Sequence, residues 1–288
     1  MMQPQRGDKG KKRAAGNTPR SSPPRGGSGK AAPGRSASGV YPFFRNDVII
    51  LAGGFGRRLA GALGGLPKPM VEVAGRPFLE WVLLYLRRFG FLSFVFSTGY
   101  RRESVRGFFG DGRRWGVEIE YAEEDAPRGT AGALHLAVAA TRSADLLVLN
   151  GDSLCLCDLG ELYRFHQSRG GEATICCVRV RDASRYGAVV FDETGMITRF
   201  AEKGCPGGGW INAGIYWMRR GFIEGMRGRA PLSLEQDILP CRTGRGLYAY
   251  RANDPFMDIG THEALARAPG FVKRNNLPRL ARATEGDA

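Results

Sequence analysis

A glycine-rich turn that follows a short apolar run is the feature that most constrains the fold of this chain. Val48 to Leu51 has the composition of a buried strand, and Gly53, Gly54 and Gly56 come directly after it. Because glycine has no Cβ, such a turn lets backbone N–H groups approach an anion closely. The turn therefore predicts a phosphate-binding loop at the carboxyl end of a strand.

Basic side chains accompany this turn. Arg57 and Arg58 lie next to the last glycine, and Lys68 follows between Pro67 and Pro69. Arg58 and Lys68 are placed to supply positive charge to a phosphoryl group during its transfer. A glycine-rich turn alone is equally compatible with a tight loop, but basic groups at this spacing favour a triphosphate site.

Strand-like and helix-like patterns alternate over the first half of the folded region, and this alternation predicts an α/β fold with a doubly wound, Rossmann-like sheet. The expected strands are 47–52, 93–98, 117–122 and 145–150, and the expected helices are 77–89, 103–109 and 131–140.

The pattern changes beyond residue 170, where short turns replace helices between strand-like stretches. We therefore expect a mixed sheet whose later strands form a lid or a substrate wall. These strands are expected over 172–181, 186–192, 196–203 and 209–218, and short helices near 233–239 and 261–268.

Composition divides the 288 residues into three parts. Residues 1–44 are rich in Pro, Gly and Ser and hold nine Lys or Arg against one Asp, so +8 of the net charge of +14 lies there. We expect a disordered tail over 1–44, one folded domain over 45–274 and a frayed tail over 275–288. The first tail is compatible with a dispensable extension, an early start codon, a transit peptide or an RNA-binding arm.

Several classes of protein are not expected from this composition. The chain has no apolar run of 18 residues, so no membrane span is expected, and the basic tail lacks the apolar core of a secretory signal. Nucleic-acid binding is not expected outside the tail, because the other 244 residues carry only +6. None of the six cysteines forms a C-x-x-C pair, which favours buried, reduced, structural cysteines in a cytoplasmic protein.

Two aspartates lie at predicted strand ends. Asp152 follows the strand 145–150, and Asp258 lies in a short apolar segment near the C-terminus. Each alone is more readily a cap or turn residue. Ligands gather at the carboxyl ends of strands in open α/β sheets, and paired carboxylates near a triphosphate suit Mg²⁺. With the glycine turn, the pair therefore favours a metal site.

From about Val48 to Ala268 the chain resembles the sugar-1-phosphate nucleotidyltransferases, which have a fold of the nucleotide-diphospho-sugar transferase type. The family signature G-G-x-G-T-R-L…P-K-P matches Gly53 to Pro69, except that Arg57 replaces the usual Thr or Ser. Within the family it is most similar to the D-glycero-D-manno-heptose 1-phosphate guanylyltransferases, in the segments Leu66–Met70, Gly75–Leu79, Glu202–Gly204 and Ser233–Asp237. The further matching motifs, in order, are Pro127–Leu134, Asn150–Asp152, Tyr186–Gly187, Glu202–Gly204, Asn212–Tyr216 and Asp258–Thr261.

The resemblance implies a reaction and catalytic roles. A sugar 1-phosphate, with heptose favoured, would attack the α-phosphate of a nucleoside triphosphate, with GTP favoured, and release pyrophosphate. Arg58 would clamp the β- and γ-phosphates, and Lys68 would stabilise charge on the α-phosphate. Asp152 would be catalytic and would hold Mg²⁺ together with Asp258.

The resemblance also implies binding residues. Glu124 would contact the base, accepting from guanine N1–H and N2–H or from uracil N3–H. The other nucleotide-binding residues would be Leu51, Ala52, Gly53, Gly54, Gly56, Arg57, Gly129 and Thr130. Those for the sugar phosphate would be Gly187, Glu202, Lys203 and Asn212.

Other functions stay open at this point. The same chemistry extends to a uridylyl- or guanylyltransferase for N-acetylmuramate, mannose or glucose 1-phosphate. The substitution at Arg57 is compatible with a catalytically silent subunit that binds nucleotide sugars. The basic tail is compatible with RNA binding. The resemblance places the enzyme in the cytoplasm, where it would supply a bacterial surface polysaccharide, and leaves open whether it is a homo-oligomer.

Overall fold

The computed structural model describes residues 45–54, 56, 64–201, 203–204 and 207–280. Three residues of the expected site, Arg57, Arg58 and Glu202, lie outside this part of the chain, as does the tail 1–44.

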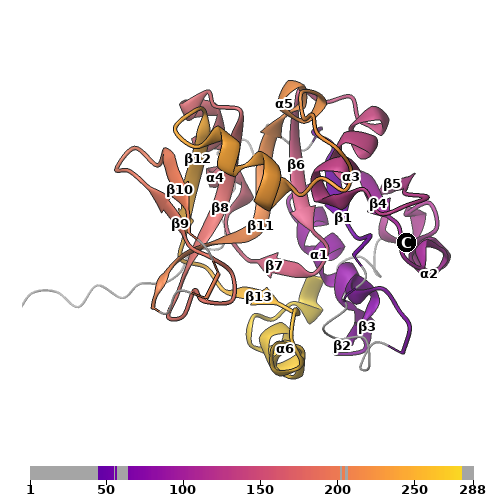
Figure 1. The fold of residues 1–288 in the computed structure, drawn as a ribbon. Coiled ribbons are helices and arrows are strands. Elements are labelled where there is room, and N and C mark those ends of the chain that lie inside the picture. The colour runs from indigo at the N-terminus through magenta and orange to yellow at the C-terminus, as the bar shows by residue number, and fades with distance from the viewer. Residues whose placement is uncertain (1–44, 55, 57–63, 202, 205–206, 281–288) are drawn as a thin grey trace, which may run out of the picture. The chain divides into compact units, whose positions relative to one another are not determined.

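A seven-stranded sheet forms the centre of the fold (Figure 1). Its strands are β1 (Val48–Leu51), β4 (Ser93–Thr98), β5 (Glu118–Glu123), β6 (Asp145–Asn150), β8 (Ala173–Val180), β11 (Gly209–Arg219) and β12 (Leu247–Ala252). They lie in the order β12-β8-β11-β6-β1-β4-β5. All neighbours pair in parallel except β11, which is antiparallel to both β6 and β8. The expected mixed, mostly parallel sheet is confirmed.

Three two-stranded ribbons lie outside the central sheet in the described part of the chain. They pair β2 (Glu72–Val73) with β3 (Arg76–Pro77), β7 (Ser153–Cys155) with β13 (Phe256–Asp258), and β9 (Val189–Phe191) with β10 (Ile197–Phe200).

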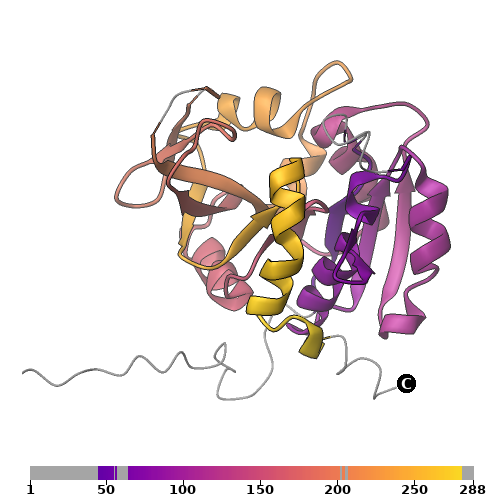
Figure 2. The ribbon, with the colours of Figure 1, turned by 90° about the horizontal axis from the view of Figure 1, so that it is seen from below.

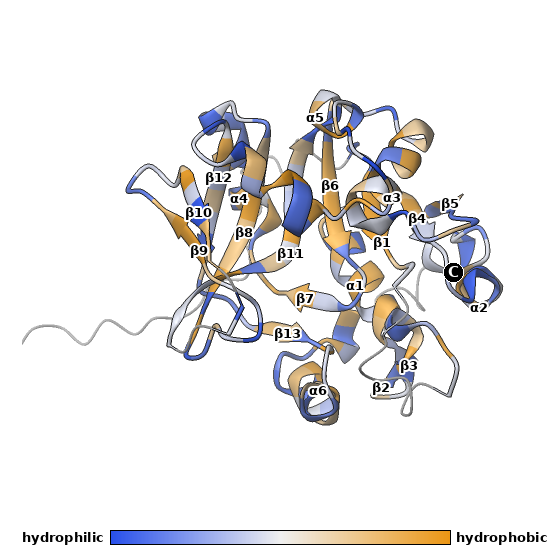
Figure 3. Ribbon diagram, viewed as in Figure 1, coloured by the Kyte–Doolittle hydropathy of each residue, from blue (hydrophilic) through white to orange (hydrophobic). Residues whose placement is uncertain are grey.

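Helices cover both faces of the sheet because the strands are apolar on both sides. Val48 and Ile50 of β1 are fully buried and belong to one core cluster, whereas Ile49 belongs to the other. The central strands are accordingly hydrophobic along their length in Figure 3. The first cluster includes α1 (Phe78–Arg87), α2 (Arg102–Phe109), α4 (Leu159–Arg169) and α6 (His262–Arg274), and the second includes α3 (Gly129–Ala137), α5 (Arg220–Glu224) and the helical turn η5 (Leu234–Ile238).

The remaining short helical turns are η2 (Lys68–Met70), η3 (Arg113–Trp115), η4 (Val138–Ala140) and η6 (Pro240–Arg242). Helix α6, yellow in Figure 2, brings the end of the chain back against β13 and β2. No helix in the described residues is both long enough and apolar enough to span a membrane.

The expected strands of the second half divide between two sheets. β8 and β11, expected over 172–181 and 209–218, join the central sheet, whereas β9 and β10, expected over 186–192 and 196–203, form a separate ribbon. Residues 275–280, expected to be frayed, include Leu277, which is 1% exposed in the core. Cys241 is exposed, unlike the four other cysteines described, which are buried as expected.

Candidate active site

A cleft of about 1270 Å³ opens at the carboxyl edge of the sheet. The parallel strands β1, β4, β5 and β6 all end there, and the chain reverses its direction of travel across the sheet between β1 and β6. Ligands bind at such switch points in open α/β sheets. Expected site residues that line the cleft are Leu51, Gly53, Gly54, Gly56, Lys68, Glu124, Gly129, Thr130, Asp152, Gly187, Lys203, Asn212 and Asp258.

Among the expected nucleotide-binding residues that the structure describes, Ala52 alone does not line this cleft. Its side chain is 1% exposed, and its backbone N–H donates to the carbonyl of Ser97 at 2.8 Å. Ala52 therefore fixes the start of the glycine-rich turn on the neighbouring strand β4.

Lys68 lies between the two aspartates expected to bind metal. Its Nζ is 2.6 Å from Asp152 Oδ2 and 3.6 Å from Asp258 Oδ1. The β7–β13 ribbon creates this arrangement, because Asp258 is paired with Ser153, the residue after Asp152. Two residues 106 positions apart in sequence are thus held at one end of a three-residue ribbon.

The carboxylate pair has the character of a cation site. Burial raises the pKa of Asp258; nearby Lys68 opposes this effect, and the charge of Asp152 adds to it. A Cβ on Gly260 would lie 2.7 Å from Asp258 Oδ1, so the glycine leaves room for the carboxylate. Two hard oxygen donors converging in this way fit a divalent cation that binds phosphate as well.

Glu124 lines the cleft directly after β5. A Cβ on Gly53 or Gly99 would lie 3.2 Å or 3.1 Å from Glu124 Oε2, so the two glycines leave room for this side chain. Its Oε1 is buried, and burial raises the pKa of this carboxyl group, while a hydrogen bond from the Arg128 backbone opposes this effect. Because the side chain lines the cleft, its carboxyl group is a candidate for contact with a ligand.

Two of the sugar-phosphate candidates, Gly187 and Lys203, lie close in sequence to the two ends of the β9–β10 ribbon. Gly187 has φ +78°, and a Cβ there would lie 2.6 Å from the carbonyl oxygen of Ala201. Lys203 lines the cleft, and the next residue, Gly204, donates its N–H to Ser184 O at 2.8 Å. Lys203 therefore places an ammonium group in the cleft, next to the close contact between the backbones of Gly187 and Ala201.

Glu235 is a site residue that the sequence reasoning missed. Thr130 Oγ1 donates to Glu235 Oε2 at 2.8 Å, and the Tyr216 hydroxyl donates to Oε1 at 3.3 Å. Asn212 Nδ2 in turn donates to the Tyr216 hydroxyl at 2.7 Å. Glu235 therefore connects a residue expected at the nucleotide with one expected at the sugar. The segment 233–237 supported only the family resemblance.

Gly129 begins α3 and packs directly on another backbone segment. Its φ is +75°, and a Cβ would lie 2.4 Å from Leu232 O, the oxygen that accepts from Ala131 N–H at 2.9 Å. This contact holds the start of α3 against the segment that leads into Glu235.

We expect Gly129→Ala to lower the free energy of unfolding by more than the roughly 1–3 kcal/mol of a strained φ alone, because the new Cβ would also collide with Leu232. Denaturant unfolding measures the loss. The matched control is Gly170→Ala, where φ is +63° but nothing lies within 4 Å of the added Cβ. Equal losses in both variants would show that the Leu232 contact does not constrain Gly129.

Comparison with known proteins identifies the class. The family model described as nucleotidyl transferase matches residues 47–275, and the chain belongs to this family. The α/β fold and the family resemblance are thereby confirmed, and the protein is a nucleotidyltransferase.

Individual relatives are similar over most of the chain. It is 33% identical to D-glycero-alpha-D-manno-heptose 1-phosphate guanylyltransferase of Aneurinibacillus thermoaerophilus, over 77% of this chain and 96% of that protein. It is also 33% identical to mannose-1-phosphate guanylyltransferase of Mycobacterium tuberculosis, over 82% of this chain and 67% of that one. The crystal structure of HddC from Yersinia pseudotuberculosis complexed with GMP-PN has a TM-score of 0.70 and 32% identity, over 78% of this chain and 98% of that chain.

Proposed function

We propose that this protein transfers GMP from GTP to a sugar 1-phosphate, with D-glycero-D-manno-heptose 1-phosphate as the favoured acceptor. The observation that carries the proposal is the Lys68–Asp152–Asp258 arrangement at the switch point of the sheet. Guanylyltransferases among the relatives, one acting on heptose 1-phosphate and another on mannose 1-phosphate, support this substrate pair.

In the proposed reaction an oxygen of the sugar phosphate attacks the α-phosphorus of GTP, and the bond to the bridging oxygen of the leaving pyrophosphate breaks. Lys68 stabilises charge on the α-phosphate, and Arg58 holds the β- and γ-phosphates. Asp152 and Asp258 are suited to hold Mg²⁺, which when bound neutralises phosphate charge. Catalysis of this kind rests on positioning and charge, without a covalent enzyme intermediate.

The glycine-rich turn binds the nucleotide in this proposal. Leu51, Gly53, Gly54 and Gly56, which line the cleft, would face the phosphates, Ala52 would anchor the turn, and Arg57 would be an additional cation. Gly129 and Thr130 complete the nucleotide side of the cleft. The place of Glu124 in the cleft lining supports a role for this residue at the guanine edge, where its carboxylate would accept from N1–H and N2–H.

The sugar 1-phosphate would bind on the opposite side of the cleft. Lys203 would pair with the phosphate, Glu202 would accept from ring hydroxyls, and Gly187 and Asn212 would complete the pocket. A cytoplasmic location, where GTP is available, and the supply of an activated sugar for a surface polysaccharide complete the proposal.

Base selection tests the nucleotide half of the proposal. Pyrophosphate release is measured with Mg²⁺, heptose 1-phosphate and each of GTP, UTP, dTTP, CTP and ATP. We expect GTP to have the highest kcat/KM. We expect Glu124→Gln to lower that value by about ten-fold to a hundred-fold, corresponding to roughly 1.5–3 kcal/mol for hydrogen bonds to a charged group.

The matched control for Glu124→Gln is Glu118→Gln, an exposed position at the opposite end of β5. Because uracil offers only one such donor, the loss with UTP is expected to be smaller than with GTP. Equal kcat/KM for all five nucleotides, or an unchanged GTP preference in Glu124→Gln, would contradict the assignment.

Glu235→Gln is expected to raise KM for the sugar phosphate and lower kcat/KM by about ten-fold or more. The amide retains the shape of the carboxylate but loses its charge and one acceptor, which corresponds to roughly 1.5–3 kcal/mol. Steady-state kinetics at saturating GTP measures the effect, with the exposed Glu193→Gln as control. Unchanged kinetics would mean that Glu235 only supports the fold.

A further inference from the structure

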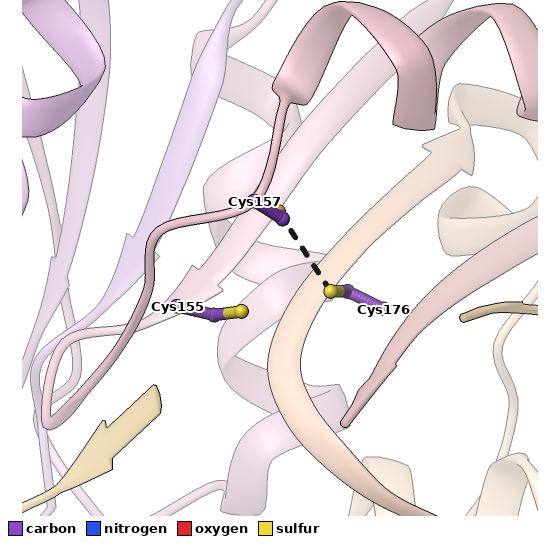
Figure 4. Close-up of side chains that lie close together, drawn as sticks. All are labelled: Cys155, Cys157 and Cys176. Atoms are coloured by element: carbon purple, nitrogen blue, oxygen red, sulfur yellow. Dashed lines mark hydrogen bonds between the residues drawn. The ribbon is translucent and has the colours of Figure 1, made fainter. Parts of the chain in front are cut away.

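Three cysteines converge in the core, away from the cleft. Cys155 ends β7, Cys157 lies in the loop that follows, and Cys176 lies in the middle of β8. Their Sγ atoms all lie within 4.8 Å of one another, and Cys157 and Cys176 are 3.8 Å apart (Figure 4). The three side chains are 0–1% exposed. In Figure 4 the sulfurs point into one common gap between the two strands.

This spacing matches that of thiolates around one metal ion. With metal–sulfur bonds of about 2.3 Å, two ligands in trigonal or tetrahedral geometry lie roughly 3.8–4.0 Å apart. The Cys157–Cys176 separation falls in that range, and Cys155 needs to move by less than 1 Å relative to its partners (about 4.8 to 4.0 Å at most). The Tyr85 hydroxyl donates to the Cys157 carbonyl and so fixes the loop that carries this ligand.

We propose that Cys155, Cys157 and Cys176 form a buried site for a soft metal ion, and that this ion is Cu(I) held by three sulfurs. Thiolate ligands select soft ions such as Cu(I) and Zn²⁺. A structural Zn²⁺ takes four ligands, whereas only these three His, Cys, Asp or Glu side chains gather at this place in the described residues. A three-coordinate ion therefore fits the donor set better.

The position of the cluster gives the ion a structural role. Cys155 is paired with Phe256 in the same ribbon that places Asp258 opposite Ser153. An ion bound by Cys155 and Cys176 would therefore connect the β7–β13 ribbon, which holds Asp258 and begins directly after Asp152, to strand β8 of the central sheet. The proposal itself does not depend on the reaction in the cleft.

The test uses the full chain with Cys205→Ser and Cys241→Ser, which leaves only the four buried cysteines, Cys155, Cys157, Cys176 and Cys177. Cu(I) is supplied without oxygen from its bicinchoninate complex, and bound copper per chain is measured. Copper X-ray absorption spectra of the loaded protein count the sulfur ligands. We expect one Cu(I) per chain with three sulfurs, and a higher Tm on loading because the ion binds only the native state.

Cys177 provides the matched control. It follows Cys176, is 0% exposed, and belongs to the core cluster on the other face of the sheet. In the double-serine background we expect Cys177→Ala to keep the ion and Cys176→Ala to lose it. Circular dichroism shows whether both variants are folded. If one of them does not fold, the X-ray absorption spectrum of the background protein still tests the proposal by itself.

Three outcomes would overturn the proposal. The first is equal copper binding by the Cys176→Ala and Cys177→Ala variants. The second is an absorption spectrum with fewer than three sulfurs in the background protein. The third is that the background protein binds no Cu(I) but binds one Zn²⁺ per chain, and that Cys176→Ala abolishes the Zn²⁺ binding.

Discussion

Lys68→Ala is expected to lower kcat for pyrophosphate release by roughly two to three orders of magnitude, the usual loss for one preorganised charge partner. Lys68 is 13% exposed and lies against both aspartates, so its ammonium group is held in one place before substrate binds. If it acts on the transition state, kcat and kcat/KM fall together while KM stays nearly constant. Initial rates at saturating GTP and sugar phosphate measure this.

Two controls separate catalysis from folding. Lys273→Ala removes an exposed lysine from α6 and is expected to leave kcat unchanged. Thermal unfolding of the Lys68→Ala protein shows how much stability is lost when two carboxylates face each other without the ammonium group. Near-normal turnover of folded Lys68→Ala protein would remove Lys68 from the mechanism.

Asp258→Asn is expected to reduce kcat by about two to three orders of magnitude at a fixed, low Mg²⁺ concentration. The amide keeps the shape of the side chain and its place beside Gly260, but it removes one of the two charged oxygen donors. The Mg²⁺ concentration that gives half-maximal rate is therefore expected to rise as well. Rates measured over a Mg²⁺ titration separate the two effects.

The Mg²⁺ titration also shows whether Asp258 acts through the cation. Excess Mg²⁺ is expected to restore part of the rate of Asp258→Asn, and none of the rate of Lys68→Ala. The exposed Glu118→Gln variant should titrate like the unaltered protein. A reduced rate with an unchanged Mg²⁺ dependence would assign Asp258 a role other than metal binding.

The sequence allowed the buried strands to be predicted closely. β4 and β6 begin and end at the residues expected from their patterns, because both are almost entirely buried and contain a short apolar run, Phe94 to Phe96 in β4 and Leu146 to Leu149 in β6. Several elements were missed, among them α4, β7 and β13. Helix α4 buries only Leu159, Gly160, Leu162 and His166 and is otherwise polar, and β7 and β13 have three residues each, too few for a pattern.

The site was predictable where it depends on strand ends. Asp152 follows a strand whose apolar run is clear, so its place at the cleft could be expected. The closeness of Asp258 depends on the β7–β13 pairing, and that of Glu235 on a hydrogen bond to Thr130 across 105 positions. Contacts between residues so far apart in the chain produce no recognisable pattern in the local sequence. Arg57, Arg58 and Glu202 lie outside the described residues, so their roles remain predictions.

The central claim, guanylyl transfer to a sugar 1-phosphate, is tested most directly with GTP, Mg²⁺ and four acceptors. These are the 1-phosphates of D-glycero-D-manno-heptose, mannose, glucose and N-acetylmuramic acid. We measure pyrophosphate release and identify the product by mass spectrometry. The account predicts turnover that requires an acceptor, with heptose 1-phosphate giving the highest kcat/KM and GDP-heptose as the product. Turnover of another acceptor would keep the chemistry and replace the sugar, whereas no turnover by folded protein that binds GTP would contradict the claim and favour a silent subunit.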